Sequence, residues 1–164
     1  MHIAPEACFM KGFEKKHQQR YITADLESPL AKVKMDIHKM PFQDNSFDVV
    51  LCNHVLEHVE SDVAALKEIQ RVLRPGGYAI LQVPFFSPVP DVTIEDTTVT
   101  DPRERERLFG QDDHVRKFGK DYPRRIEAGG LTAEASDFAK SLGADRCFHS
   151  GITRDEILYI GHKK

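Results

Sequence analysis

The chain has 164 residues, of which 40% are hydrophobic and 30% charged, as is usual for a globular domain. Its net charge of −3 gives no electrostatic footprint for nucleic acid or an anionic membrane. No hydrophobic run reaches the roughly 18 residues of a membrane span, no signal peptide is visible, and three unpatterned cysteines indicate reduced thiols. We therefore expect a single cytoplasmic domain over residues 1–164, with no nucleic-acid or membrane partner and an undefined oligomeric state.

Strand and helix patterns alternate through the first half of the chain, which predicts a parallel sheet covered on both faces. We expect a short strand at His2–Ala4 and a helix over Ala7–Gln18. Three strands are predicted next from β-branched and hydrophobic content: Arg20–Asp25, Lys32–Asp36 and Phe47–Asn53. The last of these is almost entirely hydrophobic, so we expect it to be buried on both faces.

The clearest helix follows this strand. Ser61 or Asp62 is its predicted N-cap, and hydrophobic residues recur at helical spacing as far as Leu73. Pro75–Gly77 is expected to end the helix and turn the chain. Tyr78–Val83 is then predicted to form another buried strand.

The second half of the chain is less regular. Residues Phe85–Thr100 are rich in proline and threonine and are predicted to form a long loop, and loops of that length are usually functional or disordered. The remaining predicted elements are a helix from Asp101 to Leu108, a helix over Asp121–Ala128, and strands over Leu131–Ser136 and Ile157–Ile160. Residues Ala144–Ile152 receive no assignment.

One long stretch, Met35–Pro84, resembles a known family. Its motifs MDIHKMPFQDNSFDVVLCNHVLEHV and LKEIQRVLRPGGYAILQVP are similar to the second half of class I S-adenosylmethionine-dependent methyltransferases of the methyltransferase 11 type. The resemblance implies an α/β, Rossmann-like fold with a seven-stranded, mostly parallel sheet in the order 3-2-1-4-5-7-6 and helices on both faces. It also implies S-adenosylmethionine as cofactor, S-adenosylhomocysteine as product, and a small-molecule methyl acceptor that the sequence does not identify. Residues 85–120 would then be a loop or insert near the acceptor site.

The same resemblance implies which residues hold the cofactor. Asp25 would accept hydrogen bonds from both ribose hydroxyls, because a carboxylate offers two acceptor oxygens. Asp36 would bind the adenine amino group, and the next backbone N–H, of Ile37, a ring nitrogen. The alternatives are a solvent-exposed turn for Asp25 and a capping role for Asp36. The full set of predicted cofactor-binding residues is Ala4, Glu6, Asp25, Leu26, Asp36, Ile37, Asn53 and His54.

The first turn departs from the family pattern. The family has acid-x-Gly-x-Gly where this chain has His2, Ala4 and Glu6, so the turn contains no glycine. A pyrophosphate needs bare backbone amides at such a turn and would be repelled by Glu6. S-adenosylmethionine instead carries a sulfonium and an ammonium, so we expect Glu6 to pair with the ammonium or a ribose hydroxyl. Because the chain begins at the first strand, we also expect it to be a fragment of a longer protein.

Polar residues at the end of a hydrophobic strand indicate a site, and Asn53 and His54 are such a pair. His54 and His114 are the candidate catalytic bases, needed only if the methyl acceptor is protonated. The sequence of residues 111–114, which includes His114, is equally compatible with a substrate-facing cluster and with a solvated polar turn.

Two other functions remain open at this point. His54, Glu57 and His58 match the H-x-x-E-H zinc pattern, which would make the chain a metallohydrolase. The sequence offers no credible further ligand, so we expect no metal. The second alternative is a non-catalytic cofactor-binding or interaction module of the same fold.

Overall fold

The computed structural model describes all 164 residues and is built around a seven-stranded sheet. The strand order is β3-β2-β1-β4-β5-β9-β8. Neighbouring strands from β3 to β5 are parallel, while β9 runs antiparallel to both β5 and β8. Two short strands, β6 and β7, form a separate sheet. Without them the order is 3-2-1-4-5-7-6, which confirms the predicted fold class.

The strands are β1 (His2–Ile3), β2 (Thr23–Asp25), β3 (Val33–Lys34), β4 (Phe47–Cys52), β5 (Leu73–Ile80), β6 (Ile94–Glu95), β7 (Arg116–Lys117), β8 (Thr132–Ser136) and β9 (Leu158–His162). The helices are α1 (Ala7–His17), α2 (Asp62–Val72), α3 (Pro102–Phe109), α4 (Tyr122–Ala128), α5 (Phe138–Ser141) and α6 (Ala144–Ser150), with one 3₁₀ turn at Gln18–Arg20.

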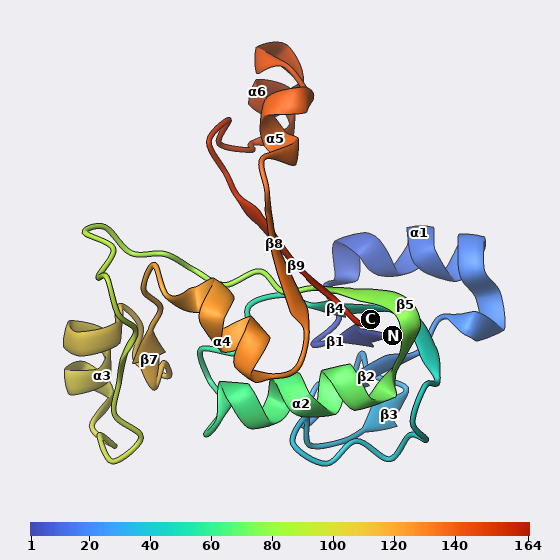
Figure 1. Ribbon diagram of the computed structural model, residues 1–164, viewed down its shortest axis with the longest axis horizontal. Coiled ribbons are helices and arrows are strands. Elements are labelled where there is room, and N and C mark those ends of the chain that lie inside the picture. Colours follow the sequence, from blue (N-terminus) through green and yellow to red (C-terminus); the bar gives the residue numbers. More distant parts are fainter.

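Helices lie on both sides of the sheet, with α1 on one side and α2 and α4 on the other (Figure 1). Ser61 caps α2, since its hydroxyl accepts a hydrogen bond from the backbone N–H of Ala64 at 3.2 Å. The buried face of α2 supplies a large part of the core through Ala65, Leu66, Ile69 and Val72. No helix connects β2 to β3, and α1 has no buried residue, so the side of the sheet that carries α1 is thinly covered.

This uneven cover corrects the prediction for β4. Val50 and Cys52 are fully buried, but Asp48 is exposed and the remaining β4 side chains are half-buried. The strand is therefore fully buried on one face only, because α1, the helix on the other side of the sheet, buries none of its own residues.

The junction after α2 also differs from the prediction. The helix ends at Val72, and Leu73 already pairs with Phe47 as the first residue of β5. The register then shifts, so that Val49 pairs with Tyr78. Pro75–Gly77 therefore does not separate helix from strand but forms an irregularity within β5, where proline and glycine are tolerated.

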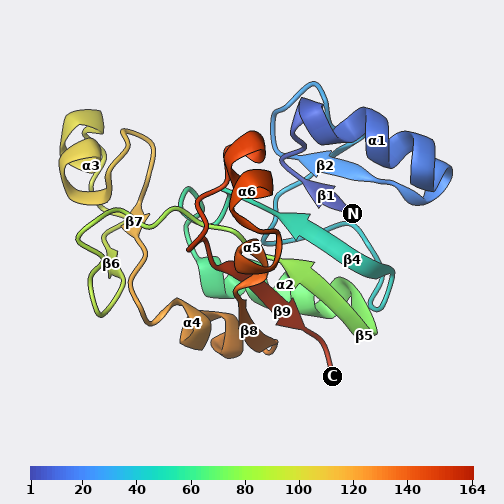
Figure 2. The same cartoon turned by 90° about the horizontal axis from the view of Figure 1, so that it is seen from above.

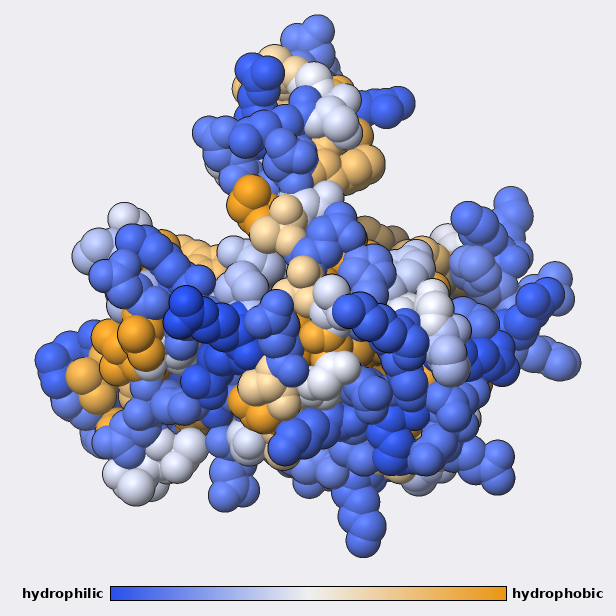
Figure 3. Space-filling view, viewed as in Figure 1, coloured by the Kyte–Doolittle hydropathy of each residue, from blue (hydrophilic) through white to orange (hydrophobic).

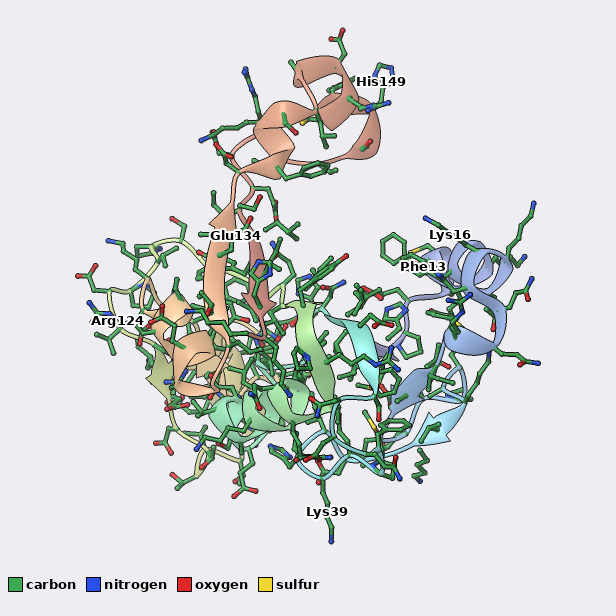
Figure 4. The ribbon with its side chains drawn as sticks, turned by 45° about the vertical axis from the view of Figure 1, so that its right-hand side comes forward. Phe13, Lys16, Lys39, Arg124, Glu134 and His149 are labelled. Atoms are coloured by element: carbon green, nitrogen blue, oxygen red, sulfur yellow. The ribbon has the colours of Figure 1, made fainter.

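The second half contains structure that the sequence did not reveal. The predicted loop Phe85–Thr100 includes β6, which pairs antiparallel with β7. The unassigned segment Ala144–Ile152 contains α6. Strands β8 and β9 extend away from the body and carry α5 and α6 at their far end, as Figure 4 shows by the positions of Glu134 and His149.

The surface and core fit an ordinary globular body. Twenty-one buried hydrophobic residues form one core cluster. The face drawn in Figure 3 is mainly hydrophilic, although the far end of the β8–β9 extension exposes Phe138 and Phe148. None of the helices has the length and hydrophobicity to cross a membrane. All three cysteines are free thiols.

Candidate active site

A pocket of about 440 Å³ lies at the carboxyl ends of the first strands of the sheet. Figure 2 shows β1, β2 and β4 side by side, with α3, β6 and β7 beyond the ends of β4 and β5. Open α/β sheets bind ligands at this edge, where the strand order reverses between β1 and β4. The pocket is lined by Ile3, Ala4, Asp25, Leu26, Met35, Asp36, Ile37, His38, His54, Val55, His58, Val59 and Glu60.

The lining fits a cationic nucleoside such as S-adenosylmethionine. It contains three carboxylates, Asp25, Asp36 and Glu60, and neither lysine nor arginine. Such a wall attracts a sulfonium and an ammonium, and it would repel the phosphates of a dinucleotide. Hydrophobic side chains make up seven of the thirteen residues, which suits the flat faces of a purine.

Asp25 ends β2 with only one of its carboxylate oxygens engaged. Its Oδ1 accepts hydrogen bonds from the backbone N–H groups of Glu27 at 2.8 Å and Ser28 at 2.7 Å. These bonds fix the turn after β2 and orient the carboxylate. Its Oδ2 makes no hydrogen bond within the chain, so it is free to accept from a ligand.

Asp36 is held in a similar way by the residue two positions later. Its Oδ1 accepts from the backbone N–H of His38 at 2.9 Å and lies 2.8 Å from Nδ1 of the same imidazole. The hydrogen bond from the backbone N–H, followed by that from the imidazole, lowers the pKa of the Asp36 carboxyl. Asp36 therefore stays an anionic acceptor at the end of the segment that follows β3.

The backbone is unusual on both sides of the pocket floor. Ala4, after β1, has φ 48°, and His54, after β4, has φ 52°. L-residues rarely adopt this left-handed conformation, and strained residues of this kind cluster at functional sites. The family glycine aligned with Ala4 would adopt it without strain.

Six of the eight predicted cofactor-binding residues line this pocket, and Glu6 and Asn53 do not. Glu6 is engaged within the chain: its Oε2 pairs with Nε2 of His2, and its Oε1 accepts from Asn53 Nδ2 at 3.3 Å. The side chain of Glu6 nevertheless stays 34% exposed. Its pairing with a cofactor ammonium remains a prediction.

The second candidate base, His114, lies in a cluster with Glu57 and His58. Nδ1 of His54 lies 3.5 Å from Oε1 of Glu57, which connects this cluster to the pocket. Burial raises the pKa of the Glu57 carboxyl to about 7, and the Asp113 carboxylate adds to this rise, whereas Arg116 opposes it. Burial, together with the neighbouring His58, lowers the pKa of His114.

Arg116 is a site residue that no sequence motif indicated. Its guanidinium is buried and donates hydrogen bonds to the backbone carbonyls of Leu56, Val59 (2.6 Å) and Glu60 (2.9 Å). It thereby fixes the loop after β4, five of whose residues line the pocket: His54, Val55, His58, Val59 and Glu60. Its backbone partners lie 56 to 60 residues earlier in the chain, so no local sequence motif could indicate this role of Arg116.

Comparison with known proteins agrees with this geometry. The family model described as "Methyltransferase domain" matches residues 7–81. A demethylmenaquinone methyltransferase of Staphylococcus epidermidis is 45% identical over 58 residues, covering 35% of this chain and 24% of that protein. An uncharacterized methyltransferase of Schizosaccharomyces pombe is 55% identical over 42 residues, covering 26% of this chain and 15% of that protein. The chain thus spans less than a third of the length of the first curated relatives it matches.

Solved structures share the fold at low sequence identity. The YcgJ protein of Bacillus subtilis superposes with a TM-score of 0.62 at 19% identity, covering 99% of this chain and 90% of that one. A Haloferax volcanii methyltransferase, solved with the Trm112 methyltransferase activator, gives 0.64 at 15% identity, covering 98% and 80%. A Burkholderia thailandensis 1,6-didemethyltoxoflavin-N1-methyltransferase with bound S-adenosylhomocysteine gives 0.57 at 15%, covering 99% and 70%.

Fold, pocket and family match point in the same direction. Residues 7–81 match the family model of a methyltransferase domain, and the whole chain shares the Rossmann-like fold of the solved structures named above. The H-x-x-E-H zinc-hydrolase alternative is not favoured by any of these comparisons.

Proposed function

We propose that this chain binds S-adenosylmethionine in the pocket at the ends of β1 to β4 and transfers its methyl group to a small-molecule acceptor. One observation carries the proposal: the pocket has three carboxylates, no lysine or arginine, and one unengaged carboxylate oxygen at the end of β2. This arrangement suits a cofactor with ribose hydroxyls and two positive charges, and the match to a methyltransferase domain supports S-adenosylmethionine as that cofactor.

The roles of the residues follow from their positions in the pocket. Asp25 would accept from the ribose through its free Oδ2, with Leu26 packing beside it. Asp36 and the backbone of Ile37 would bind the adenine edge. Ala4 and His54, which follow the neighbouring strands β1 and β4, would border the methionine part and the methyl group. Each assignment combines the geometry above with the roles that the family resemblance implies.

For this reaction the protein mainly has to position the cofactor and the acceptor. The cofactor supplies a methyl group on a sulfonium, which an acceptor atom attacks in line. The chain has to hold the acceptor close to that methyl and to limit the access of water. The His54 imidazole is 59% exposed and borders the pocket, so it is the residue placed to take a proton from a protonated acceptor.

The segment over residues 85–120 is proposed to shape the acceptor site. Its α3, β6 and β7 lie beyond the ends of β4 and β5 (Figure 2), and its residue Val115 donates a backbone hydrogen bond to the carbonyl of Glu57 at 3.0 Å. We propose that residues 1–164 act as one methyltransferase domain that contains this insert.

Calorimetric titration tests the cofactor step directly. S-adenosylhomocysteine should bind the purified chain at one site, whereas NAD⁺ should not bind, because its pyrophosphate meets the acidic wall. Binding of NAD⁺ in preference to S-adenosylhomocysteine would contradict the proposal. If S-adenosylhomocysteine binds but no methyl transfer is found across a panel of hydroxyl, amine and thiol acceptors, the non-catalytic module becomes the better account.

A further inference from the structure

A partly buried cluster beside the cofactor pocket has two buried polar atoms without partners. Glu57 and His114 are each only 1% exposed, and together with His58 they bring their potential ligand atoms within 4.8 Å of one another. Oε2 of Glu57 and Nε2 of His114 are buried and make no hydrogen bond. Buried polar groups in folded proteins nearly always have a partner, so these two atoms point to a ligand held by the cluster.

Both imidazoles are oriented by contacts on the side away from the cluster. Nδ1 of His114 lies 3.4 Å from the backbone carbonyl of Phe109, which can only accept a hydrogen bond. Nδ1 of His58 lies 3.2 Å from Oδ2 of Asp113. Each Nδ1 therefore carries the proton, and each Nε2 presents a lone pair. Histidines that bind metals are held in this way, with the second ring nitrogen donating to a carbonyl or carboxylate.

Hydrogen bonds from Val115, just before β7, and from Arg116, the first residue of β7, hold the backbone around the cluster. Val115 donates to the carbonyl of Glu57 at 3.0 Å, and the buried Arg116 holds the carbonyls of Val59 and Glu60. The two imidazole rings meet edge to face, with their centroids 4.8 Å apart. The cluster is thus held by two segments that are themselves joined by hydrogen bonds.

We propose that Glu57, His58 and His114 bind one divalent transition-metal ion of the zinc type. Two imidazole nitrogens and one carboxylate favour zinc or a similar ion over magnesium, which prefers oxygen ligands. Zinc lies about 2.0–2.2 Å from nitrogen and oxygen ligands, so the three side chains have to draw in by about 1 Å on binding. Three protein ligands leave a coordination position open.

The position of the cluster gives this ion a role that rests on the proposed function. His58 contributes to both the cluster and the cofactor pocket, so the ion would lie in the wall beside the methyl group. An acceptor with a hydroxyl or carboxylate oxygen fits the open position. We therefore assign the acceptor to the class of oxygen-bearing small molecules that chelate or ligate a divalent ion.

Metal binding can be measured without any methyl acceptor. The chelator-treated chain is titrated with Zn²⁺ alone by calorimetry, and with Co²⁺ to record its visible absorption spectrum. One equivalent should bind, and Co²⁺ should give the absorption of a low-symmetry, four- or five-coordinate ion. His58→Ala, at a partly exposed position, should weaken Zn²⁺ binding about 10-fold or more, and Glu57→Gln should do the same. Asp113→Asn should weaken it less, because it only orients His58.

His149→Ala is the matched control, since His149 lies on α6 at the far end of the β8–β9 extension (Figure 4) and should not alter binding. A melting curve for each variant establishes that it is folded. The proposal would be overturned if the unmodified chain did not bind Zn²⁺ stoichiometrically. It would also be overturned if folded His58→Ala and Glu57→Gln bound Zn²⁺ as tightly as the unmodified chain. Titration of the unmodified chain with S-adenosylhomocysteine separates the two claims: stoichiometric Zn²⁺ binding without cofactor binding would contradict the proposed function and leave the metal site standing.

Discussion

Ala4 and His54 follow neighbouring parallel strands, and both adopt left-handed backbone conformations, with φ of 48° and 52°. The pairing of Ile3 with Cys52 places the two residues at the same edge of the sheet, where both line the cofactor pocket. Two strained residues at the strand-order reversal indicate that the backbone there is set by the site and not by local preference.

Replacing Ala4 by glycine should therefore relieve strain. A left-handed conformation costs alanine roughly 1–2 kcal/mol in the folded state, and glycine avoids this cost. Glycine also makes the unfolded chain more flexible, which offsets part of the gain in stability. Ala4→Gly should therefore raise the free energy of unfolding by up to about 1 kcal/mol. Ala24→Gly, in the adjacent strand β2 with ordinary φ, is the control and should lower it. Urea denaturation of both variants checks this; equal destabilisation would show that the Ala4 conformation carries no strain.

Asp25→Asn tests the ribose contact without removing the turn. The asparagine oxygen can still accept from the N–H groups of Glu27 and Ser28, but the free carboxylate oxygen and the charge are lost. Affinity for S-adenosylhomocysteine should fall by about 1.5–3 kcal/mol, or about 10- to 150-fold. Glu27→Gln, on the exposed side of the same turn, should bind like the unmodified chain. Calorimetric affinities that agree for all three proteins would contradict the assignment of Asp25.

Glu6 can be tested by choosing ligands with and without the amino-acid part of the cofactor. 5′-Methylthioadenosine retains the ribose and adenine but lacks the ammonium. If Glu6 pairs with the ammonium, Glu6→Gln should weaken S-adenosylhomocysteine binding and leave that of methylthioadenosine unchanged. Equal weakening of both ligands would point to a ribose hydroxyl instead. If neither affinity changes, Glu6 serves only its contacts with His2 and Asn53.

Glu68 on α2 links the stability of the fold to the segment that carries Asp36. Its carboxylate accepts from Arg71 at 2.7 and 2.8 Å and from the backbone N–H of Met40 at 2.9 Å. The hydrogen bonds from Arg71 lower the pKa of Glu68. Because the pKa of Glu68 is lower in the folded state than in the unfolded chain, its ionised carboxylate stabilises the folded state at pH values above the unfolded pKa of 4.5. This stabilisation is lost as the pH falls through the pKa of the folded state.

Glu68→Gln should accordingly cost about 0.5–1 kcal/mol of unfolding free energy at pH 7, as is typical of a partly exposed ion pair. The difference from the unmodified chain should shrink as the pH falls below about 4. Glu106→Gln, at an exposed position on α3, should show no such pH-dependent difference. Urea denaturation at both pH values checks this, and a difference that grows on acidification would contradict the assigned sign.

The elements that the sequence predicted well are those with strong local patterns. The hydrophobic run of β4, the spacing and cap of α2, and the capped helix at Asp101 all appear close to the predicted bounds. Helix α6 escaped prediction because it is short and its N-cap residue is Gly143, which has no side chain to cap the helix. The irregularity at Pro75–Gly77 escaped because its geometry depends on pairing with β4.

The same distinction separates the two parts of the candidate site. Asp25, Asp36 and His54 could be predicted because each directly follows a recognisable strand and matches a family position. The proximity of His114 to Glu57 and His58 could not be predicted, because His114 comes from a different segment that lies near them only in the folded chain. The sequence offered no third ligand and led us to expect no metal, whereas the folded chain brings His114 close to Glu57 and His58.

The central claim is that the cofactor lies over the carboxyl ends of β1, β2 and β4. A crystal structure of this chain with S-adenosylhomocysteine tests it most directly. The account predicts ribose hydroxyls within hydrogen-bond distance of Asp25 Oδ2, adenine beside Asp36 and Ile37, and the sulfur between Ala4 and His54. Ligand density in another cavity, or a ribose that does not contact Asp25, would contradict it.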